Sequence, residues 1–356
     1  MGKGLTYAAR GLGALLVAAT VLPLLKSRHW SVRAFDFPRL QIAFGAGLWC
    51  AGALARWKRL ERADQRLLGF TAAALGTQLL QIRPYTRLAR KEVLLGEGDA
   101  DLQIVTANVL QENRRTDVYK RLFEELQPDV ILLTEPNGWW AKEMEYLKAS
   151  YPHVVECPLE NTFGMILYSR LELIEPELRF LVKKEIPSIK TRVRLKDGGV
   201  IWLYAVHPEP PGSLKPDKTP RGSGPRDVEL LLLAEELEKL KEPVVVVGDF
   251  NDVAWSHTTR LFKRLSRLLD PRRGRGMFNT FHASYPPLRY PLDHLFHSEH
   301  MVLIDFKRLP YTGSDHFPIY AALQLAPEAA EIQEQDQPSR TDEKEAEEVI
   351  VKAKTE

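Results

Sequence analysis

The segment from Val244 to Ser256, VVVVGDFNDVAWS, decides how the middle of this chain folds. Its four consecutive valines predict a buried strand, because a strand that is apolar on both faces fits the interior of a sheet. Gly248 ends the run, and Asp249 and Asn251 follow it. Open α/β sheets bind their ligands beyond the carboxyl ends of the strands, so the segment predicts a functional site there. On its own it also fits an ordinary turn rich in Asp, Asn and Gly.

Charge is spread unevenly along the 356 residues, a length that allows two domains. Residues 1–91 hold 15 Lys and Arg against 3 Asp and Glu, a net +12, and residues 326–356 hold 4 against 10, a net −6. The whole chain is +2, which leaves −4 for residues 92–325. A region of this charge disfavours general binding of duplex DNA, because phosphate contacts need clustered Lys and Arg. The two cysteines, Cys50 and Cys157, provide no disulfide framework and no metal motif.

Three apolar stretches, separated by basic residues, occupy the region before Lys91: Leu5–Leu25, Leu40–Ala55 and Leu67–Ile82. Their uninterrupted cores are about 15 residues, against the roughly 20 that a membrane-spanning helix needs. Flanking Trp, Lys and Arg side chains are typical of membrane interfaces. A cleavable signal peptide would explain only the first stretch, and a helical bundle buried in water conflicts with helices so poor in polar faces. We therefore expect residues 1–91 to be a membrane anchor of three transmembrane helices, whose orientation the even distribution of Lys and Arg does not reveal.

Past Lys91 the pattern changes to alternating strands and helices, which predicts sheets with helices packed outside them. Strands are expected at 102–109, 129–134, 164–169, 200–206, 244–247, 293–296, 302–306 and 319–323, and helices at 118–126, 141–149, 225–240 and 258–268. Residues 208–225 are too rich in Pro and Gly for either element and predict a mobile loop at the rim of the site. The acidic residues 326–356 predict a disordered tail or a frayed helix.

Polar side chains that bind cations or phosphates recur at the ends of these predicted strands. They are Asn108, Glu135, His207, Asp249, Asn251, Asp293, Asp315 and His316. Hard oxygen ligands such as Glu135, Asn108 and Asp315 suit Mg²⁺ or Mn²⁺. A histidine held by a carboxylate acts as a general base or stabilises charge at phosphorus, and a carboxamide donates to a phosphate oxygen. Each residue alone is an ordinary turn or cap residue, but together they indicate metal-assisted hydrolysis of a phosphoester.

The motifs TAN, LLTEP, GDFND, LDHLF and SDHFP follow one another between residues 101 and 325. In order and spacing they resemble the endonuclease/exonuclease/phosphatase superfamily, which includes deoxyribonuclease I, apurinic endonucleases, inositol phosphatases and neutral sphingomyelinases. The resemblance implies an α/β (α+β) fold, a four-layer αββα sandwich of two packed mixed sheets. The apolar stretches before it look like a bacterial membrane-anchored subgroup, in which the catalytic domain is expected outside the cytoplasmic membrane.

The resemblance also implies a role for each polar residue. Glu135 is expected to be the main metal ligand, with Asn108 nearby and Asp315 as a further ligand. Asp249 is expected to position or protonate a group at the phosphate, which Asn251 contacts.

Two histidines complete the set that the resemblance implies. Asp293 orients His316, and His207 matches a second histidine that assists the leaving group in the deoxyribonuclease I and sphingomyelinase branch. The expected activity is hydrolysis of a phosphodiester or phosphomonoester by metal-activated in-line attack of water, in a multi-pass membrane protein with no stable protein partner. A nuclease acting on DNA or RNA, or a lipid phosphodiesterase, is the alternative. A catalytically silent membrane binding protein is a third, but it has no need for Asp293 and His316 together.

Overall fold

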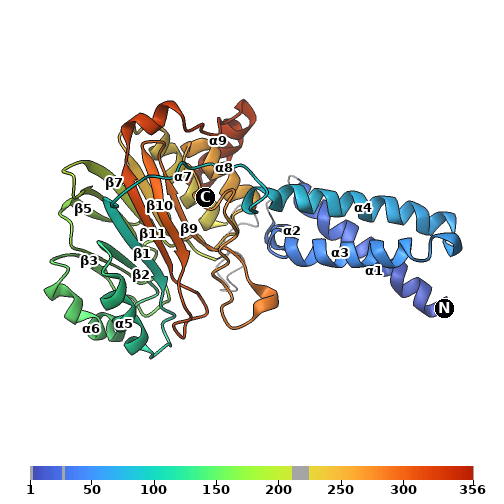
Figure 1. Cartoon of the computed structure of the whole chain (residues 1–356), viewed down its shortest axis with the longest axis horizontal. Helices are drawn as coiled ribbons and strands as arrows, with labels where there is room; N and C mark the ends of the chain where they lie inside the picture. Colours follow the sequence, from blue (N-terminus) through green and yellow to red (C-terminus); the bar gives the residue numbers. More distant parts are fainter. Residues whose placement is uncertain (1–2, 26–28, 211–223, 356) are drawn as a thin grey trace.

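The computed structural model describes residues 3–25, 29–210 and 224–355. A helical stem projects from a domain built on two β-sheets (Figure 1). The stem, the described residues from 3 to 85, contains helices α1 (Lys3–Val21), α2 (Trp30–Arg33), α3 (Arg39–Leu54) and α4 (Arg62–Ile82). Its 3-10 turns are η1 (Leu22–Leu24), η2 (Ala34–Asp36), η3 (Trp57–Arg59) and η4 (Arg83–Tyr85). Helices α1, α3 and α4 pack along one another.

Both sheets of the domain are mixed. The six-stranded sheet has the order β10 (Met301–Arg308), β11 (Ile319–Leu325), β1 (Leu102–Asn108), β2 (Val130–Thr134), β4 (Met165–Ser169) and β3 (His153–Cys157). The five-stranded sheet has the order β5 (Leu173–Arg179), β6 (Ser188–Arg194), β7 (Val200–Val206), β8 (Val244–Asp249) and β9 (Asp293–His297). Strands β1 and β2 are parallel, as are β7 and β8, and the other neighbours are antiparallel.

Helices cover the outer face of each sheet, so the domain has four layers (Figure 1). Apolar side chains beneath α5 (Thr116–Leu126) and α6 (Gly138–Glu143) form one outer core with the six-stranded sheet. Those beneath α7 (Pro225–Glu238), α8 (His257–Ser266) and α9 (Arg340–Thr355) form the other. The third and largest core lies between the sheets. The predicted αββα sandwich is therefore confirmed.

The valine run explains why β8 occupies the middle of this arrangement. Val245 and Val247 point into the core between the sheets, whereas Val244 and Val246 point to the core beneath the outer helices. All six residues of β8 are buried. A strand covered on both faces needs an apolar residue at every position, which is what the run supplies.

Two sequence expectations need correction. Strands β3, β5 and β6 were not predicted; β5, for example, is a half-exposed edge strand without a continuous apolar run. The acidic end of the chain is not disordered between 340 and 355, because α9 buries Ala346, Val349 and Ile350 against α7 and α8. The predicted mobile loop at 208–225 lies mostly in 211–223, outside the described residues.

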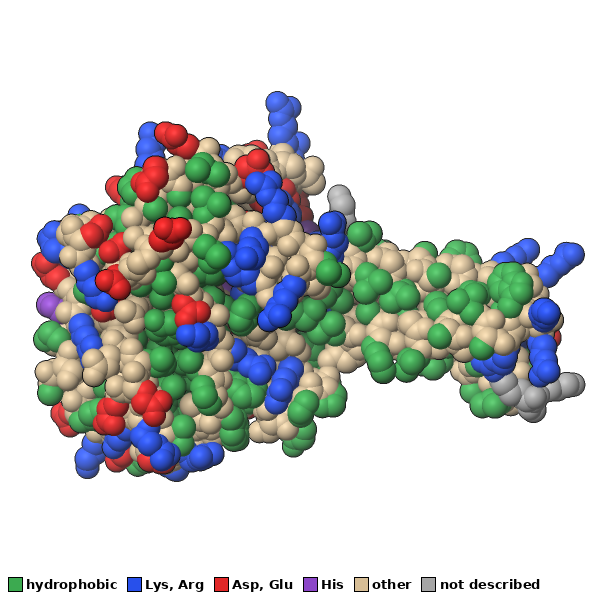
Figure 2. Space-filling view, in the orientation of Figure 1, with side chains coloured by type: hydrophobic (Ala, Val, Ile, Leu, Met, Phe, Trp, Pro, Cys, Tyr) green, Lys and Arg blue, Asp and Glu red, His purple; other side chains and the backbone are tan. Residues whose placement is uncertain are grey.

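The stem supports the predicted three-span anchor only in part. Residues Gly4–Leu24, which comprise nearly all of α1 together with η1, are the only described stretch long and apolar enough to cross a membrane, and an N-terminal signal sequence meets the same criterion. Helix α3 has only 16 residues, and α4 begins with Arg62, Asp64 and Arg66. The stem nevertheless exposes large apolar side chains along its length (Figure 2).

Candidate active site

The carboxyl ends of parallel strands bring the predicted polar residues together at one edge of the sandwich. Strands β1 and β2 are parallel, so Asn108 at the end of β1 and Glu135 directly after β2 leave the sheet side by side. In the other sheet, β7 and β8 are parallel, which places His207 beyond β7 close to Asp249 at the end of β8. Asp293 begins β9 and lies opposite Asp249 in the antiparallel pairing of these strands.

Glycine at position 248 allows the ends of β7 and β8 to approach. Gly248 has a φ of +146°, and a Cβ there would lie 1.9 Å from the carbonyl oxygen of Val206. Any side chain would force the two strands apart, and with them His207 and Asp249. Three residues later Asn251 has a φ of +51°, a left-handed conformation that Asn adopts more readily than most residues.

The side chain of Asn108 joins two carboxylates from different sheets. Its Nδ2 donates to Glu135 Oε1 at 2.8 Å and to Asp249 Oδ2 at 3.1 Å. Its Oδ1 accepts a hydrogen bond from the amide of Leu110 at 3.0 Å. Asn108 and Asp249 are each 1% exposed, so water does not compete for these bonds. The carboxamide therefore holds the two carboxylates in a fixed relation.

His316 lies between two carboxylates. Its Nδ1 is 2.7 Å from Asp293 Oδ2, and its Nε2 is 3.6 Å from Asp249 Oδ2. Burial by itself would lower the pKa of His316, but the two carboxylates outweigh it and raise the pKa to about 10. The imidazole is therefore doubly protonated at neutral pH. Its Nδ1–H is bound to Asp293, and the longer distance to Asp249 leaves Nε2–H uncommitted.

The second predicted histidine has the opposite electrostatic character. His207 is 2% exposed, with Nε2 3.9 Å from Asp249 Oδ2 and Nδ1 without a hydrogen-bond partner among the described residues. Burial lowers the pKa of His207, and the charge of His316 lowers it further against the attraction of Asp249. The pKa of Asp249 is raised, chiefly by burial. The site thus pairs one charged and one neutral histidine across a single carboxylate.

Asn251 and Asp315 lie at the margin of this cluster. The Asn251 side chain donates to the carbonyl of Pro208 at 2.9 Å, and its amide donates to Asp249 Oδ1 at 2.8 Å. Asp315 is half-buried, and among the described residues its carboxylate accepts only a long hydrogen bond from the Ser314 hydroxyl, 3.4 Å. The structure therefore assembles six of the eight predicted side chains into one cluster and leaves these two beside it.

Comparison with known proteins agrees with this geometry. The sequence profile of the Endonuclease/Exonuclease/phosphatase family matches residues 105–316, more than half of the chain. The chain belongs to this family. The matched region begins in β1 and ends at His316, so it includes all eight predicted site residues. No curated protein matches the chain by sequence.

Solved structures share the fold of the domain at low sequence identity. The human Nocturnin catalytic domain with bound sulfate is 16% identical, with a TM-score of 0.51 over 65% of this chain and 97% of its own. An endonuclease/exonuclease/phosphatase from Bacteroides vulgatus is 14% identical, with a TM-score of 0.51 over 63% and 98%. One from Beutenbergia cavernae DSM 12333 is 18% identical, with a TM-score of 0.50 over 64% and 72%.

Within this endonuclease/exonuclease/phosphatase domain, Glu135 is the carboxylate best suited to a cation. It accepts a hydrogen bond from neutral Asn108 and forms no ion pair among the described residues. Burial raises its pKa to about 7, and nearby Asp249 and Asp315 add to the effect. Atoms of Asp249, Asp293 and His316 also lie within 4.8 Å of one another, but the positive charge of His316 already compensates that group. The charge of His316 lowers the pKa of Glu135 without offsetting burial, so a divalent ion beside Glu135 would supply the compensating charge that remains.

The residues that contact and support the members of this cluster were not predicted from the sequence. Arg226, which is buried at the start of α7, donates to the carbonyl of Asn251 at 3.0 Å. The Thr280 hydroxyl accepts from the amide of Asp293 at 3.3 Å, and the ring of Phe281 lies 5.0 Å from that of His316. None of these follows a predicted strand, so the rule that found the other residues does not find them.

Proposed function

We propose that this chain is a membrane-attached phosphoesterase that depends on a divalent metal ion, Mg²⁺ or Mn²⁺. The observation that carries the proposal is the chain of contacts from the half-buried Glu135 through the buried Asn108 and Asp249 to His316 and Asp293. A protein that only binds a ligand does not need to bury so many ionisable groups, because each costs desolvation free energy. The family match supports the same reaction class.

Glu135 would hold the metal ion, with Asp315 close enough for its charge to raise the pKa of Glu135. When bound, such an ion supplies Lewis-acid polarisation of a phosphoryl oxygen and neutralises developing charge. Asn108 holds the Glu135 carboxylate toward this position. The oxygen of Asn108 is bonded to the Leu110 amide, so its role in this proposal is to position Glu135.

The charged His316 would stabilise negative charge on the phosphate as water attacks. Asp293 fixes the orientation of the ring through Nδ1, which leaves Nε2–H to face the reacting group. Because its lowered pKa keeps His207 neutral at neutral pH, it would assist the leaving oxygen with a hydrogen bond from its one ring N–H, without transferring a proton. Asp249 lies between the two rings and can position either of them.

Membrane attachment is the second part of the proposal, and the stem supports it. Residues Gly4–Leu24 have the length and composition of a membrane-crossing helix. Phe44 in α3 and Phe70 and Leu80 in α4 are between 64% and 70% exposed, which is costly in water and favourable in lipid. The proposed location of the protein is therefore the cytoplasmic membrane, where α3 and α4 would pack beside α1.

The experiment that tests the function is a hydrolysis screen of the purified full chain in detergent. Substrates should include DNA, RNA, phospholipids, sugar phosphates and a chromogenic phosphodiester, each with Mg²⁺, Mn²⁺, Ca²⁺ or EDTA. We expect hydrolysis of at least one class with Mg²⁺ or Mn²⁺ and none with EDTA. Hydrolysis that persists in EDTA would contradict the metal requirement, and no hydrolysis under any condition would contradict the proposed function.

A further inference from the structure

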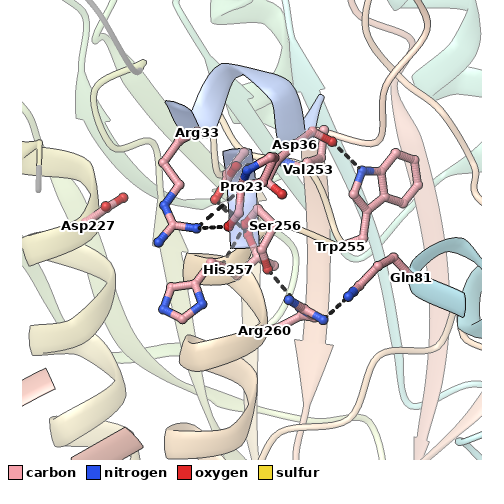
Figure 3. Close-up of polar contacts among 12 residues, drawn as sticks. Pro23, Arg33, Asp36, Gln81, Asp227, Val253, Trp255, Ser256, His257 and Arg260 are labelled. Atoms are coloured by element: carbon pink, nitrogen blue, oxygen red, sulfur yellow. Dashed lines mark hydrogen bonds and ion pairs between the residues drawn. The ribbon is translucent and has the colours of Figure 1, made fainter. Parts of the chain in front are cut away.

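The stem contacts the catalytic domain at residues 252–256, in the turn that follows β8. The indole Nε1–H of Trp255 donates to the backbone carbonyl of Asp36 at 2.8 Å (Figure 3). The hydroxyl of Tyr85 donates to the carbonyl of Ala254 at 2.8 Å. Trp255 and Ala254 are both 0% exposed. Two buried hydrogen bonds, one donated by the stem and one donated by the catalytic domain, therefore connect the stem to consecutive residues of this turn.

Apolar packing surrounds both hydrogen bonds. Tyr85 of the stem forms one buried cluster with Val253, Ala254, Trp255 and Leu292 of the catalytic domain. The rings of Tyr85 and Trp255 meet edge to face, with centroids 6.0 Å apart. Phe37 and Leu40 of the stem also pack against this cluster. The two regions thus share a core at this point and do not merely touch.

This shared core adjoins two segments that carry candidate catalytic residues, one with Asp249 and Asn251 and the other with Asp293. Leu292 directly precedes Asp293, and its carbonyl accepts a hydrogen bond from the amide of Phe250 at 3.0 Å. Phe250 lies between Asp249 and Asn251 in the sequence. A displacement of the turn would therefore be transmitted to Asp249 and Asp293 together.

A second route leads from the stem to His316. The ring of Phe37 meets that of Tyr290 edge to face, with centroids 5.7 Å apart. Tyr290 pairs with Phe281 through backbone hydrogen bonds, and the Phe281 ring lies 5.0 Å from the His316 ring. Phe37 of the stem is therefore connected to the His316 imidazole through Tyr290 and Phe281.

The carbonyl that receives the Trp255 hydrogen bond is held in place by the stem itself. The Asp36 carboxylate is paired with the buried guanidinium of Arg39. Arg39 donates to Gln78 Oε1 at 3.1 Å, and Gln78 donates to the Thr20 hydroxyl at 2.9 Å. This network joins α3, α4 and α1, so the position of Asp36 depends on the assembled stem. Arg260 of α8 adds a hydrogen bond to Gln81 of α4 (Figure 3).

We infer that the stem is part of the catalytic apparatus as well as an attachment, and that Tyr85 and Trp255 are positioning residues. They hold the turn after Asn251 so that Asp249, Asn251 and Asp293 keep their places at the reacting phosphate. This inference rests on the proposed function. It assigns the helical region a direct effect on turnover, which a membrane tether alone does not have.

The test uses the full chain in detergent with two matched pairs of variants. Tyr85→Phe removes the hydroxyl that binds Ala254 and keeps the ring. Its control is Tyr151→Phe, which removes an equally buried hydroxyl that donates to the Pro128 carbonyl at 2.9 Å, away from the site.

The second pair concerns the indole hydrogen bonds. Trp255→Phe removes the donor to Asp36. Its control is Trp49→Phe, which removes an indole hydrogen bond of 2.7 Å to the Ala9 carbonyl within the stem. Each control loses the same kind of bond as its partner; the two tyrosine bonds are both buried, whereas the Trp49 bond is only partly buried and tests whether any loosening within the stem lowers kcat.

We expect kcat to fall about fivefold to thirtyfold in Tyr85→Phe and in Trp255→Phe, the range that corresponds to losing one buried hydrogen bond from the competent arrangement. KM should stay within about twofold, because the turn positions reacting groups and does not bind remote parts of the substrate. Tyr151→Phe and Trp49→Phe should keep the wild-type kcat. Equal losses of kcat in variants and controls would show that kcat falls whenever the protein is destabilised, and this result would overturn the inference.

Hydrogen–deuterium exchange of the same samples gives a readout that does not depend on activity. We expect faster exchange of residues 249–256 and 290–293 in Tyr85→Phe and Trp255→Phe, and no change there in the controls. If wild-type protein hydrolyses no phosphoester, the proposed function fails, and the exchange still decides whether the stem holds the turn. Unchanged exchange in both variants would overturn the inference even if the wild-type enzyme is active.

Discussion

The stem exposes large apolar side chains along its length, although it also contains two small buried apolar clusters, whereas most apolar side chains of the catalytic domain lie in three large cores. In the stem, Phe44 and Leu80 are 70% and 68% exposed, whereas Thr20, Arg39 and Gln78 are at most 2% exposed. In the catalytic domain the apolar side chains form three buried cores. Figure 2 shows hydrophobic side chains along the stem, with Lys and Arg gathered at its far end and over the catalytic domain.

Under the proposed membrane attachment, the difference implies that different forces stabilise the two regions. The catalytic domain buries apolar surface, which is the dominant stabilising contribution in water. In a lipid environment apolar burial between helices contributes little, and interhelical hydrogen bonds and close packing take over. The bonds of Gln78 to Arg39 and Thr20 are of this kind. The predictions below test each side of this comparison.

The largest expected effect lies wholly in the catalytic domain. Glu135→Gln should lower metal-dependent hydrolysis by about 10³-fold or more, because the proposed ion contributes several kcal/mol of charge stabilisation. The substitution keeps the shape of the side chain and the hydrogen bond from Asn108, so the fold should survive. Turnover numbers with Mg²⁺ or Mn²⁺ measure the loss, and Glu156→Gln at an exposed ion pair serves as the control. Turnover within a few-fold of the wild type would show that the ion is held elsewhere.

The next effect concerns Asp293 and His316 as a single unit. Asp293→Asn and His316→Gln should each lower kcat by about 10²- to 10⁴-fold, the usual contribution of a positioned acid–base group. The double variant should lose little more than either single variant, because each single change already removes the contribution of the oriented, charged imidazole. If the two losses multiply in the double variant, the residues act independently. A nearly normal Asp293→Asn enzyme would reduce Asp293 to a structural residue at the start of β9.

A buried carboxylate in the catalytic domain provides a contrast to the paired polar groups of the stem. Glu229 in α7 is 2% exposed, and its Oε1 has no hydrogen-bond partner among the described residues. Burial raises the pKa of Glu229 to about 8, above its ordinary value of 4.5.

The folded state therefore keeps the Glu229 proton while the unfolded chain has already lost it, and stability falls as pH rises from about 4.5 to 8. The slope is of the order of 1 kcal/mol for each pH unit. Glu229→Gln should remove this slope, so the variant should gain stability over the wild type at pH 8 and not at pH 4. Urea unfolding at several pH values measures it. Parallel pH profiles for the two proteins would contradict the assignment.

The smallest expected effect tests the exposed apolar surface of the stem. Phe44→Arg should reduce membrane integration by about 2.5 to 3.5 kcal/mol, the cost of Arg near the middle of a lipid-facing helix. The control is Phe180→Arg, at a 44% exposed phenylalanine of the catalytic domain, which should be nearly neutral. The fraction of protein that resists carbonate extraction from membranes measures both. Equal behaviour of the two variants would show that water, and not lipid, surrounds the stem.

The sequence predicted those features of the catalytic domain that depend on short segments. The four valines define β8 because a strand covered on both faces needs an apolar residue at each position. Asn108, Glu135, His207 and Asp249 could be selected because parallel strands end at the same edge of a sheet. The contact of Asp293 with His316, 23 positions away, followed from the family resemblance, and the structure has it at 2.7 Å.

Other features could not be predicted because they have no local pattern. Strand β5 is half-exposed at the edge of its sheet and lacks the apolar run that marks a buried strand. In α9, only Ala346, Val349 and Ile350 are buried, and the acidic residues around them favour an interpretation as disordered. The neighbouring surface of α7 and α8 decides that this helix packs.

By itself the sequence determined most of the buried strands and the polar residues at their ends, since each of these depends on the residues within one segment, and the family resemblance implied the sandwich. Only the tertiary structure decided how the stem and the catalytic domain meet. Trp255 binds Asp36 across 219 positions, and Tyr85 binds Ala254 across 169. The predicted boundary near residue 91 separates these partners, yet they share one buried core. Such contacts arise when two folded surfaces fit each other, and no periodicity within either segment encodes that fit.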